Sequence, residues 1–345
     1  PVLRDSVASR GLGDVFKRQG LTLSFDESVQ AMNQIMEGEA TPAQFGAFVT
    51  ALRLKGETVD EVAGMASVMR EKSLQVNTSG NLVDTCGTGG DSSGTFNVST
   101  ASAFVAAGAG AKVAKHGNRA MSGKTGSADV LEALGANISL SPESVEKCIE
   151  QTGFGFMFAQ GFHPSMRFAA SPRREIGIRT VFNILGPLTN PAGASNQVVG
   201  VSDLSTGEIM VRSLARLGSK KALVVHGADG LDEITISGPS TIWFLANGFI
   251  TKSEVSPDQF GIGVSPIADI KALNPSESAE IIKDVVDGGT GGAQDIVVLN
   301  TSATLVSCGI ADDLEDGIEL AKESIVSGRA ASCLNAYVSL SKSLN

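Results

Sequence analysis

The chain has 345 residues, of which 40 are glycine, 37 are acidic and 27 are lysine or arginine, giving a formal net charge of −10. Nucleic acids are bound by clustered lysine and arginine. This balance therefore excludes a nucleic-acid partner for the surface as a whole, while a local basic pocket stays possible. No uncharged apolar run reaches about 18 residues, which excludes a membrane-spanning helix and predicts no membrane partner.

The four cysteines are scattered and form no C-x-x-C motif, so they are predicted to be reduced thiols in a reducing compartment. The three histidines form no zinc-binding motif. Residues 1–14 carry charges and lack the apolar core of a secretory signal peptide. We expect a cytoplasmic protein, or one of the plastid stroma if the source is a plant and a transit peptide was removed.

The first 75 residues contain only helical patterns. Three predicted helices start at residues whose hydroxyl groups can cap a helix, namely Ser24, Thr41 and Thr58, and Gly38 and Gly56 end the first two. Apolar residues recur at helical spacing behind each cap. This block predicts a small domain of short amphipathic helices.

From residue 81 onward, short β-prone runs alternate with helical patterns. The β-prone runs cover residues 81–85, 111–114, 138–140, 154–158, 197–201 and 222–226. Helical patterns follow most of them, at 98–107, 128–134, 207–217 and in a segment opened by Ser141. Such alternation is typical of a parallel sheet with crossover helices.

The alternation changes in two places. Residues 173–185 read as a helix followed by a rigid loop at 186–191, which suggests a return to the helical domain. Residues 234–255 show a hairpin-like pattern around Gly238-Pro239 and Asn247-Gly248. The C-terminal helices are predicted at 278–286, 293–308, 314–326 and 330–340.

The predicted fold is therefore of the α/β class, with a small all-helical domain beside a large domain whose mainly parallel central sheet is flanked by helices. The predicted boundaries are 1–80 with 172–198 for the helical domain and 81–171 with 199–345 for the α/β domain.

The strongest local feature is the glycine-rich stretch Asp84-Thr-Cys-Gly-Thr-Gly-Gly-Asp91, which follows a predicted strand. Bare backbone of this kind exposes successive N–H groups to an anion, although a tight strand-to-helix turn alone would explain it equally well. Residues 95–100, Thr-Phe-Asn-Val-Ser-Thr, then open a helix. They are either simple caps or a phosphate site at a helix N-terminus.

A second polar stretch, residues 115–127, follows the next predicted strand and carries Lys115, Arg119 and Lys124. Because ligands of open α/β sheets bind outside the carboxyl ends of the strands, the two stretches predict one crevice for a polyphosphate. A solvated loop is the less favoured alternative.

Two further features gain meaning beside such a crevice. Asp229-Gly-Leu-Asp232-Glu233 is an acidic turn that, next to a polyphosphate, predicts a Mg²⁺ site rather than a solvated turn. Arg173 is either a fork for a substrate carboxylate or one half of a surface ion pair. His116 and His163 are either acid–base groups or structural hydrogen bonders.

An ordered set of motifs resembles the anthranilate phosphoribosyltransferase family over nearly the whole chain. The motifs are Gly-Glu-Ala-Thr-Pro-Ala-Gln at 38–44, Ala-Leu-Arg-Leu-Lys-Gly-Glu-Thr at 51–58, Gly-Thr-Gly-Gly-Asp at 87–91, Asn-Val-Ser-Thr at 97–100, Lys-His-Gly-Asn-Arg at 115–119, Asn-Ile-Leu-Gly-Pro-Leu-Thr-Asn-Pro at 183–191 and Leu-Asp-Glu at 231–233. No single motif is specific, but the set is.

The resemblance implies a pentosyltransferase of tryptophan biosynthesis. Such an enzyme moves the phosphoribosyl group of 5-phosphoribosyl-1-pyrophosphate (PRPP) to the amine of anthranilate and releases pyrophosphate. It also implies a homodimer formed through the helical domain and a fold related to that of the pyrimidine nucleoside phosphorylases. The alternatives are a phosphorylase of that kind, which would need no Mg²⁺, and a non-catalytic nucleic-acid-binding relative.

The resemblance also implies roles for individual residues. Lys115 and Asp91 would be catalytic, Lys115 by stabilising charge on the departing pyrophosphate. Anthranilate would contact Gly87, Asn118 and Arg173, and two Mg²⁺ ions would be held with Ser99, Asp232 and Glu233. The implied PRPP contacts are Gly87, Gly90, Asp91, Thr95, Asn97, Val98, Ser99, Thr100, Lys115, His116, Gly117, Asn118, Arg119, Ala120, Met121, Ser122, Gly123 and Ser127.

Overall fold

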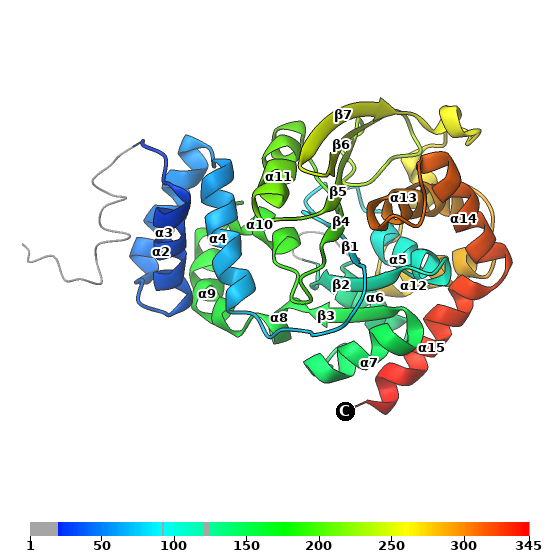
Figure 1. Ribbon diagram of the computed structural model, residues 1–345, viewed down its shortest axis with the longest axis horizontal. Helices are drawn as coiled ribbons and strands as arrows, with labels where there is room; N and C mark the ends of the chain where they lie inside the picture. The colour runs from blue at the N-terminus through cyan, green and yellow to red at the C-terminus, as the bar shows by residue number, and fades with distance from the viewer. Residues whose placement is uncertain (1–19, 92, 121–124, 345) are drawn as a thin grey trace, which may run out of the picture.

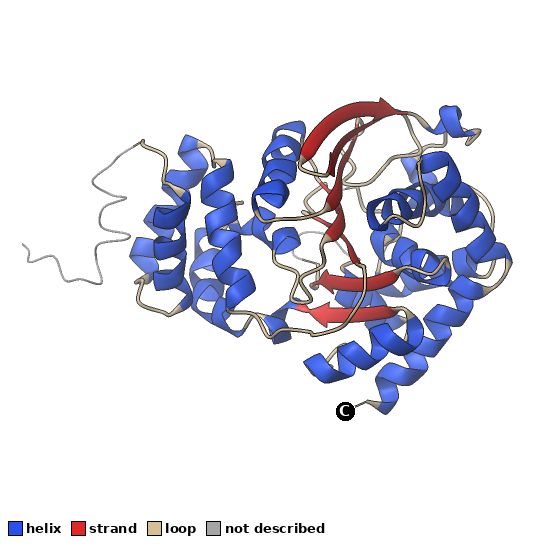
Figure 2. Ribbon diagram, viewed as in Figure 1, coloured by secondary structure: helices blue, strands red, loops and turns tan. Residues whose placement is uncertain are grey.

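The computed structural model describes residues 20–91, 93–120 and 125–344. Met121, Ser122 and Gly123, three of the expected PRPP contacts, lie outside the described residues. Helices gather at one end of the molecule beside a central sheet, and further helices cover the sheet at the other end (Figures 1 and 2). No helix in the described ranges is long and apolar enough to cross a bilayer.

The helical end begins with the three predicted helices, α2 (Phe25–Met36), α3 (Pro42–Lys55) and α4 (Val59–Glu71). Ser24, Thr41 and Thr58 each form a capping box, in which the cap and the third helical residue satisfy each other's backbone N–H groups. The predicted starts are thus confirmed. A later segment, α9 (Arg167–Ile176), packs against α2 and α3 (Figure 1).

The sheet has seven strands in the order β3-β2-β1-β4-β5-β6-β7. The first five in this order are parallel, and β6 and β7 are antiparallel additions at one edge. The strands are β1 (Leu82–Gly87), β2 (Lys112–Gly117), β3 (Phe154–Phe158), β4 (Asn196–Gly200), β5 (Lys221–Gly227), β6 (Ser240–Ala246) and β7 (Phe249–Val255). The α/β fold class with a mainly parallel sheet is confirmed.

Helices cover the sheet on both faces. The larger apolar core lies between the sheet and the helices α5 (Val98–Gly108), α6 (Ser127–Ala133), α7 (Pro142–Thr152), α12 (Pro275–Val286), α13 (Gly292–Cys308), α14 (Leu314–Val326) and α15 (Arg329–Ser343). The remaining elements are α8 (Ala159–Phe162), α10 (Phe182–Leu185), α11 (Leu204–Arg216) and the 3₁₀ turns η2 (Pro164–Met166), η3 (Gly186–Leu188), η4 (Pro257–Phe260) and η5 (Ile267–Ile270).

A second apolar cluster continues from the helical end into the sheet. It contains Phe45 of α3 and Phe182 of α10 together with Val199, Val224 and Trp243 from β4, β5 and β6. Helix α11 lies between, packed on α4 at one side and on β5 and β6 at the other. The helical end therefore shares its core with one face of the sheet, which fixes where the loops of the two parts meet.

The predicted helix at 173–185 is wrong as one element. Helix α9 already starts at Arg167 and ends at Ile176, because Gly177 adopts the left-handed conformation with φ of +67° and caps it. Helix α10 begins only at Phe182. The chain between them is thereby free to turn toward the sheet.

Two smaller predictions also need correction. Residues 138–140 form no strand, because side chains bind the local backbone groups. Asn137 Oδ1 accepts the N–H of Ser139, and the backbone N–H of Asn137 donates to Ser341 Oγ. The hairpin turns at Asn247-Gly248 as predicted, but Gly238-Pro239 only precedes its first strand.

Gly207 of α11 tests how tightly the shared core is packed. A Cβ atom at this position would overlap the ring of the buried Trp243. Overpacking costs about 1–3 kcal/mol, and the gain in helix propensity offsets about 1 kcal/mol of this cost. We therefore expect Gly207→Ala to lower the free energy of unfolding in urea by up to about 2 kcal/mol.

Gly46→Ala is the matched control, because Gly46 is also inside a helix and its nearest side-chain atom, on Ile176, would lie 3.7 Å from the new Cβ. This variant should be neutral or gain up to about 1 kcal/mol. Equal effects of the two alanines would contradict the packing argument.

Candidate active site

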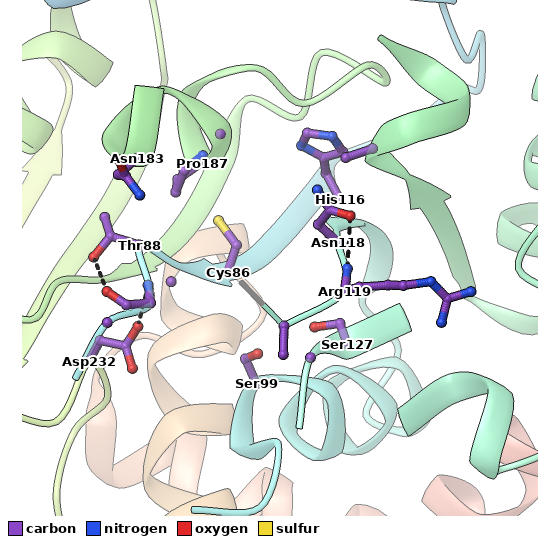
Figure 3. Close-up of a pocket in the computed structure, with 18 of the residues that line it drawn as sticks. Cys86, Thr88, Ser99, His116, Asn118, Arg119, Ser127, Asn183, Pro187 and Asp232 are labelled. Carbon is purple, nitrogen blue, oxygen red and sulfur yellow. Dashed lines mark hydrogen bonds between the residues drawn. The ribbon is translucent and has the colours of Figure 1, made fainter. Parts of the chain in front are cut away.

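One cavity of about 410 Å³ opens at the carboxyl ends of β1 and β2 (Figure 3). The acidic turn that follows β5 and residues of α9 and α10 also line it. The structure brings most of the predicted site residues to its wall. These are Gly87, Gly90, Asp91, Thr95, Asn97, Val98, Ser99, His116, Gly117, Asn118, Arg119, Ala120, Ser127, Arg173, Asp232 and Glu233. Lys115 and Thr100, by contrast, do not line it.

The glycine-rich loop after β1 lies against the acidic turn after β5. The Gly89 N–H donates to Asp232 Oδ2 over 2.9 Å, and a Cβ atom at Gly87 would overlap that same carboxylate. Gly89 and Gly90 have φ of +63° and +84°, which disfavours other residues. Glycine is thus required here both by the turn and by the closeness of Asp232.

The N-terminus of α5 forms the floor below this loop. Asn97 caps the helix by accepting the Thr100 N–H at 3.0 Å, and its own amide donates to the Thr125 carbonyl at 2.7 Å. Ser99 lies in the first turn with its hydroxyl at the cavity, whereas Thr100 points into the core. The floor is therefore a helix N-terminus, the usual place for a phosphate group.

Lys115 is buried behind Ser99 instead of facing the cavity. Its ammonium donates to the Thr85 carbonyl, to Thr85 Oγ1 at 3.3 Å and to Ser99 Oγ at 3.1 Å. Burial lowers the pKa of Lys115, and the carboxylate of Asp84 opposes that shift. The cation thus supports the floor of the cavity from below.

Arg119 is among the lining residues, but its side chain points away from the cavity (Figure 3). Its guanidinium pairs with Asp129 at 2.9 Å and with Glu132 at 2.5 Å, and these hydrogen bonds raise its pKa. The Ala120 N–H also donates to Asp129 Oδ2 over 2.9 Å. The side chain of Arg119 therefore shapes this loop from outside.

The acidic residues form a cluster of half-buried side chains at the cavity wall. Burial and the nearby charge of Asp91 raise the pKa of Asp232 to about 6, and burial together with Asp232 raises the pKa of Glu233 well above its usual range. Each carboxylate thus lies where its ionised form is poorly compensated by the protein alone. Carboxylate oxygens in this setting fit Mg²⁺, which takes one or two carboxylates and completes its shell with water and substrate phosphates.

The far wall of the cavity has a different character. The Arg173 guanidinium lies 5.3 Å above the ring of Phe182, and burial lowers its pKa. The Nε2 atoms of His116 and His163 are 3.2 Å apart, and burial lowers their pKa values to about 3 and about 4. Both imidazoles are thus neutral at pH 7, which favours hydrogen bonding over strong base catalysis.

Several lining residues were not among the predicted site residues. Both Nη atoms of Arg179 donate to the Gly89 carbonyl over 3.2 Å, and a Cβ atom at Gly90 would overlap this guanidinium. Asn183 and Pro187 line the opposite wall from Ser99 (Figure 3). Pro187 belongs to the predicted rigid loop and Asn183 to the predicted helix before it, and the family motif at 183–191 that contains both could have pointed to the site. Arg179 follows a helix end that no pattern marked.

Models of two protein families match the chain. The glycosyl transferase family a/b domain covers residues 79–331, and the helical bundle domain of the same family covers 17–73. Among curated relatives, the anthranilate phosphoribosyltransferase of Thioalkalivibrio sulfidiphilus is 52% identical over 94% of this chain and 96% of its own. That of Herpetosiphon aurantiacus is 53% identical over 89% and 92%. The chain belongs to the anthranilate phosphoribosyltransferase family.

Solved structures of this family agree with the fold. The enzyme from Thermus thermophilus superposes with a TM-score of 0.90 at 39% identity, covering 97% of this chain and 99% of its own. The anthranilate phosphoribosyltransferase from Saccharomyces cerevisiae, solved in complex with PRPP and Mg, gives 0.89 at 27% identity, covering 98% and 100%.

The acidic cluster of this family member predicts a pH-dependent stability. Because the pKa of Asp232 is raised from 3.8 to about 6, its ionisation disfavours the folded state at any pH above about 3.8, and the full cost is reached above about pH 6. In the absence of Mg²⁺, Asp232→Asn should therefore raise the free energy of unfolding at pH 8 by up to about 3 kcal/mol. The gain should fall to about half at pH 5 and vanish below the ordinary pKa of an aspartate.

Urea unfolding of both proteins in EDTA at a series of pH values measures this difference. The exposed Asp258→Asn is the control and should change little. An Asp232→Asn variant that is no more stable than the parent at pH 8 would contradict the raised pKa of this carboxylate in the folded protein.

Proposed function

We propose that this chain transfers the 5-phosphoribosyl group of PRPP to the amine of anthranilate, releasing pyrophosphate, as a step of tryptophan biosynthesis. The observation that carries the proposal is the meeting of a glycine-rich anion loop, a half-buried acidic pair and Arg173 around one cavity. Related enzymes of that name, and yeast structures in complex with PRPP and Mg or with 4-fluoroanthranilate, support it.

PRPP would occupy the side of the cavity formed by the glycine-rich loop and α5. The backbone of Gly87 to Asp91 and the first turn of α5 would face its phosphates. Lys115 would act by holding Ser99 and by adding positive charge below the floor as negative charge grows on the leaving pyrophosphate. Thr100 would support the helix start from the core.

Mg²⁺ would be held by Asp232 and Glu233 with the Ser99 hydroxyl, and we propose two ions shared with the substrate. When bound, Mg²⁺ supplies charge stabilisation of the phosphate oxygens. Asp91 lies near both carboxylates and adds to their mutual repulsion. This repulsion would favour binding of a divalent cation together with PRPP, because the cation would neutralise the carboxylates.

Anthranilate would lie toward α9 and α10, with its carboxylate on Arg173 and with Gly87 and Asn118 beside it. An aromatic amine is already neutral at pH 7, so the acceptor requires little proton abstraction. The neutral pair His116 and His163 suits this requirement, since it can orient a polar group without acting as a strong base. Positioning of the two substrates would provide much of the rate enhancement.

We also propose the domain division expected from the sequence, with 1–80 and 172–198 as the helical part and 81–171 with 199–345 as the PRPP-binding part. A homodimer would form through the helical part, where Leu21 and Leu54 are 64% and 84% exposed. Such a dimer would remove these apolar side chains from water. The cytoplasm stays the expected compartment.

The decisive experiment follows the fluorescence of anthranilate with PRPP and Mg²⁺. We expect loss of fluorescence that requires the chain, PRPP and Mg²⁺ together. A pyrimidine nucleoside phosphorylase would instead cleave a pyrimidine nucleoside with inorganic phosphate and without Mg²⁺. Absence of PRPP-dependent loss would refute the proposed transfer, and phosphorolysis would establish the alternative.

Arg173 provides a test of where anthranilate lies. Arg173→Ala should raise the KM for anthranilate by at least about tenfold and the KM for PRPP much less, because a charged hydrogen bond to the carboxylate is worth about 1.5–3 kcal/mol. The adjacent Arg174→Ala is the control, since Arg174 is exposed and does not line the cavity. If both KM values rise equally in Arg173→Ala, the proposed role is wrong.

A further inference from the structure

Strands β1 and β2 separate just below the cavity. Their paired register covers only Leu82 with Lys112 and Val83 with Val113. Beyond this point β1 stays paired with β4 up to Gly87, and β2 stays paired with β3 up to Gly117. The sheet thus forks at the two strands that lead into the predicted phosphate loops, and the facing backbone groups need other partners.

Side chains take the place of the missing backbone hydrogen bonds in this fork. Asp84 Oδ1 accepts the His116 N–H over 3.1 Å, and Asn190 Nδ2 donates to the Ala114 carbonyl over 2.8 Å. On the β1 side, the Lys115 ammonium donates to the Thr85 carbonyl. Each of these backbone groups at the fork is therefore satisfied by a buried polar side chain.

Asp84 and Asn190 also bind each other. Asn190 Nδ2 donates to Asp84 Oδ2 over 2.8 Å. Asn190 is 3% exposed and Asp84 is 0% exposed. Burying an ionised carboxylate is costly unless hydrogen bonds and a cation compensate it, and here the Lys115 charge provides that cation. The pair is thus a complete polar network whose members depend on one another.

Asn190 comes from a different part of the chain than the fork it fills. It follows η3 in the segment that returns from the helical end to β4, and Gly186, Pro187 and Thr189 of that segment line the cavity. Pro187 lies across the cavity from Ser99 (Figure 3). One buried amide therefore ties the far wall of the cavity to the strand ends that carry its floor.

We propose that Asp84 and Asn190 are positioning residues, which hold the anthranilate-side segment 186–189 at a fixed distance from the PRPP-side ends of β1 and β2. The inference rests on the proposed transfer between these two substrates. The attacking amine would be held by one wall of the cavity and the anomeric carbon by the other. A change that loosens the contact between these walls would therefore lower the reaction rate, although neither Asp84 nor Asn190 touches a substrate.

The purely structural alternative is that the pair merely satisfies buried backbone groups. Asn196 offers a matched control, because it is a buried asparagine, 2% exposed, that bridges β4 and β1 at the opposite end of these strands. Its Nδ2 donates to Asn81 Oδ1 at 2.7 Å and to the Leu82 carbonyl at 2.9 Å. It has similar burial and bonding, but neither its neighbours in the chain nor its bonding partners Asn81 and Leu82 line the cavity.

The test compares Asn190→Ala with Asn196→Ala by thermal unfolding, by fluorescence kinetics and by calorimetric titration with PRPP and Mg²⁺. Both variants should lose similar thermal stability. Only Asn190→Ala should lower kcat/KM for anthranilate, by at least about tenfold, because small displacements of one reactant cost large factors in rate. Its affinity for PRPP should stay within about threefold of the parent.

Asp84→Asn is the second variant, and it tests the same link between the walls if Asn190→Ala does not fold. It keeps the shape of the side chain but leaves one acceptor oxygen for the two donors, so it should show the same loss for anthranilate. Combining it with Asn190→Ala should add little further loss, since both remove one link.

The two proposals fail in different ways. A parent enzyme without PRPP-dependent loss of anthranilate fluorescence refutes the proposed function, and this inference falls with it. An active parent whose Asn190→Ala and Asn196→Ala variants lose the same activity, or whose Asn190→Ala and Asp84→Asn variants keep the parent kinetics, overturns the positioning role alone.

Discussion

The repulsion among half-buried carboxylates in and beside the turn after β5 is the constraint around which the cavity is built. Asp232 and Glu233 lie close to Asp91, and burial makes their ionised forms costly. The surrounding groups reduce that cost: the Gly89 N–H binds Asp232, and the Lys115 charge acts on Glu233 from below. None of this neutralises the cluster fully, which leaves a cation and a polyanion to be bound together.

This constraint explains features that otherwise look unrelated. A side chain at Gly87 or Gly200 would overlap Asp232, so the ends of β1 and β4 need bare backbone. Lys115 must be buried to act from beneath the floor, and a buried ammonium requires the hydrogen bonds of Thr85 and Ser99. The fork between β1 and β2 makes room for this cation, and Asp84 provides its counter-charge.

The sequence was enough to predict what depends on local rules. The caps at Ser24, Thr41 and Thr58 and the turn at Asn247-Gly248 each follow from one or two residues, and the alternation of strands and helices follows from hydrophobic pattern. The run at 138–140 failed because its backbone is engaged by Asn137 and by Ser341, which lies 204 residues away from Asn137 in the chain. No local pattern contains such a contact.

The candidate site shows the same division. Motifs identified the loops that meet at the cavity, yet they could not tell which way a side chain points. Arg119 faces outward because Asp129 and Glu132 of α6 lie within its reach there, and Lys115 faces inward because the strands separate beside it. Arg179 enters the site only because Gly177 ends α9. These outcomes depend on packing between separate segments.

The abundance of glycine and the acidic net charge have a common physical explanation at this site. A polyanion can be bound by backbone N–H groups, by a helix N-terminus and by a metal ion held on carboxylates, and none of these requires a basic surface. Gly87, Gly89, Gly90 and Gly94, with Gly117 and Gly126, line the cavity and contribute backbone of that kind, whereas Gly108 lies at the far end of α5 against Ala330. The glycines at 288–292 instead form the turn between α12 and α13, where Gly288 and Gly291 have φ of +98° and +106°. The glycines therefore meet two separate requirements. At the cavity they allow the backbone to approach a ligand closely, and between α12 and α13 they allow the positive φ angles of the turn.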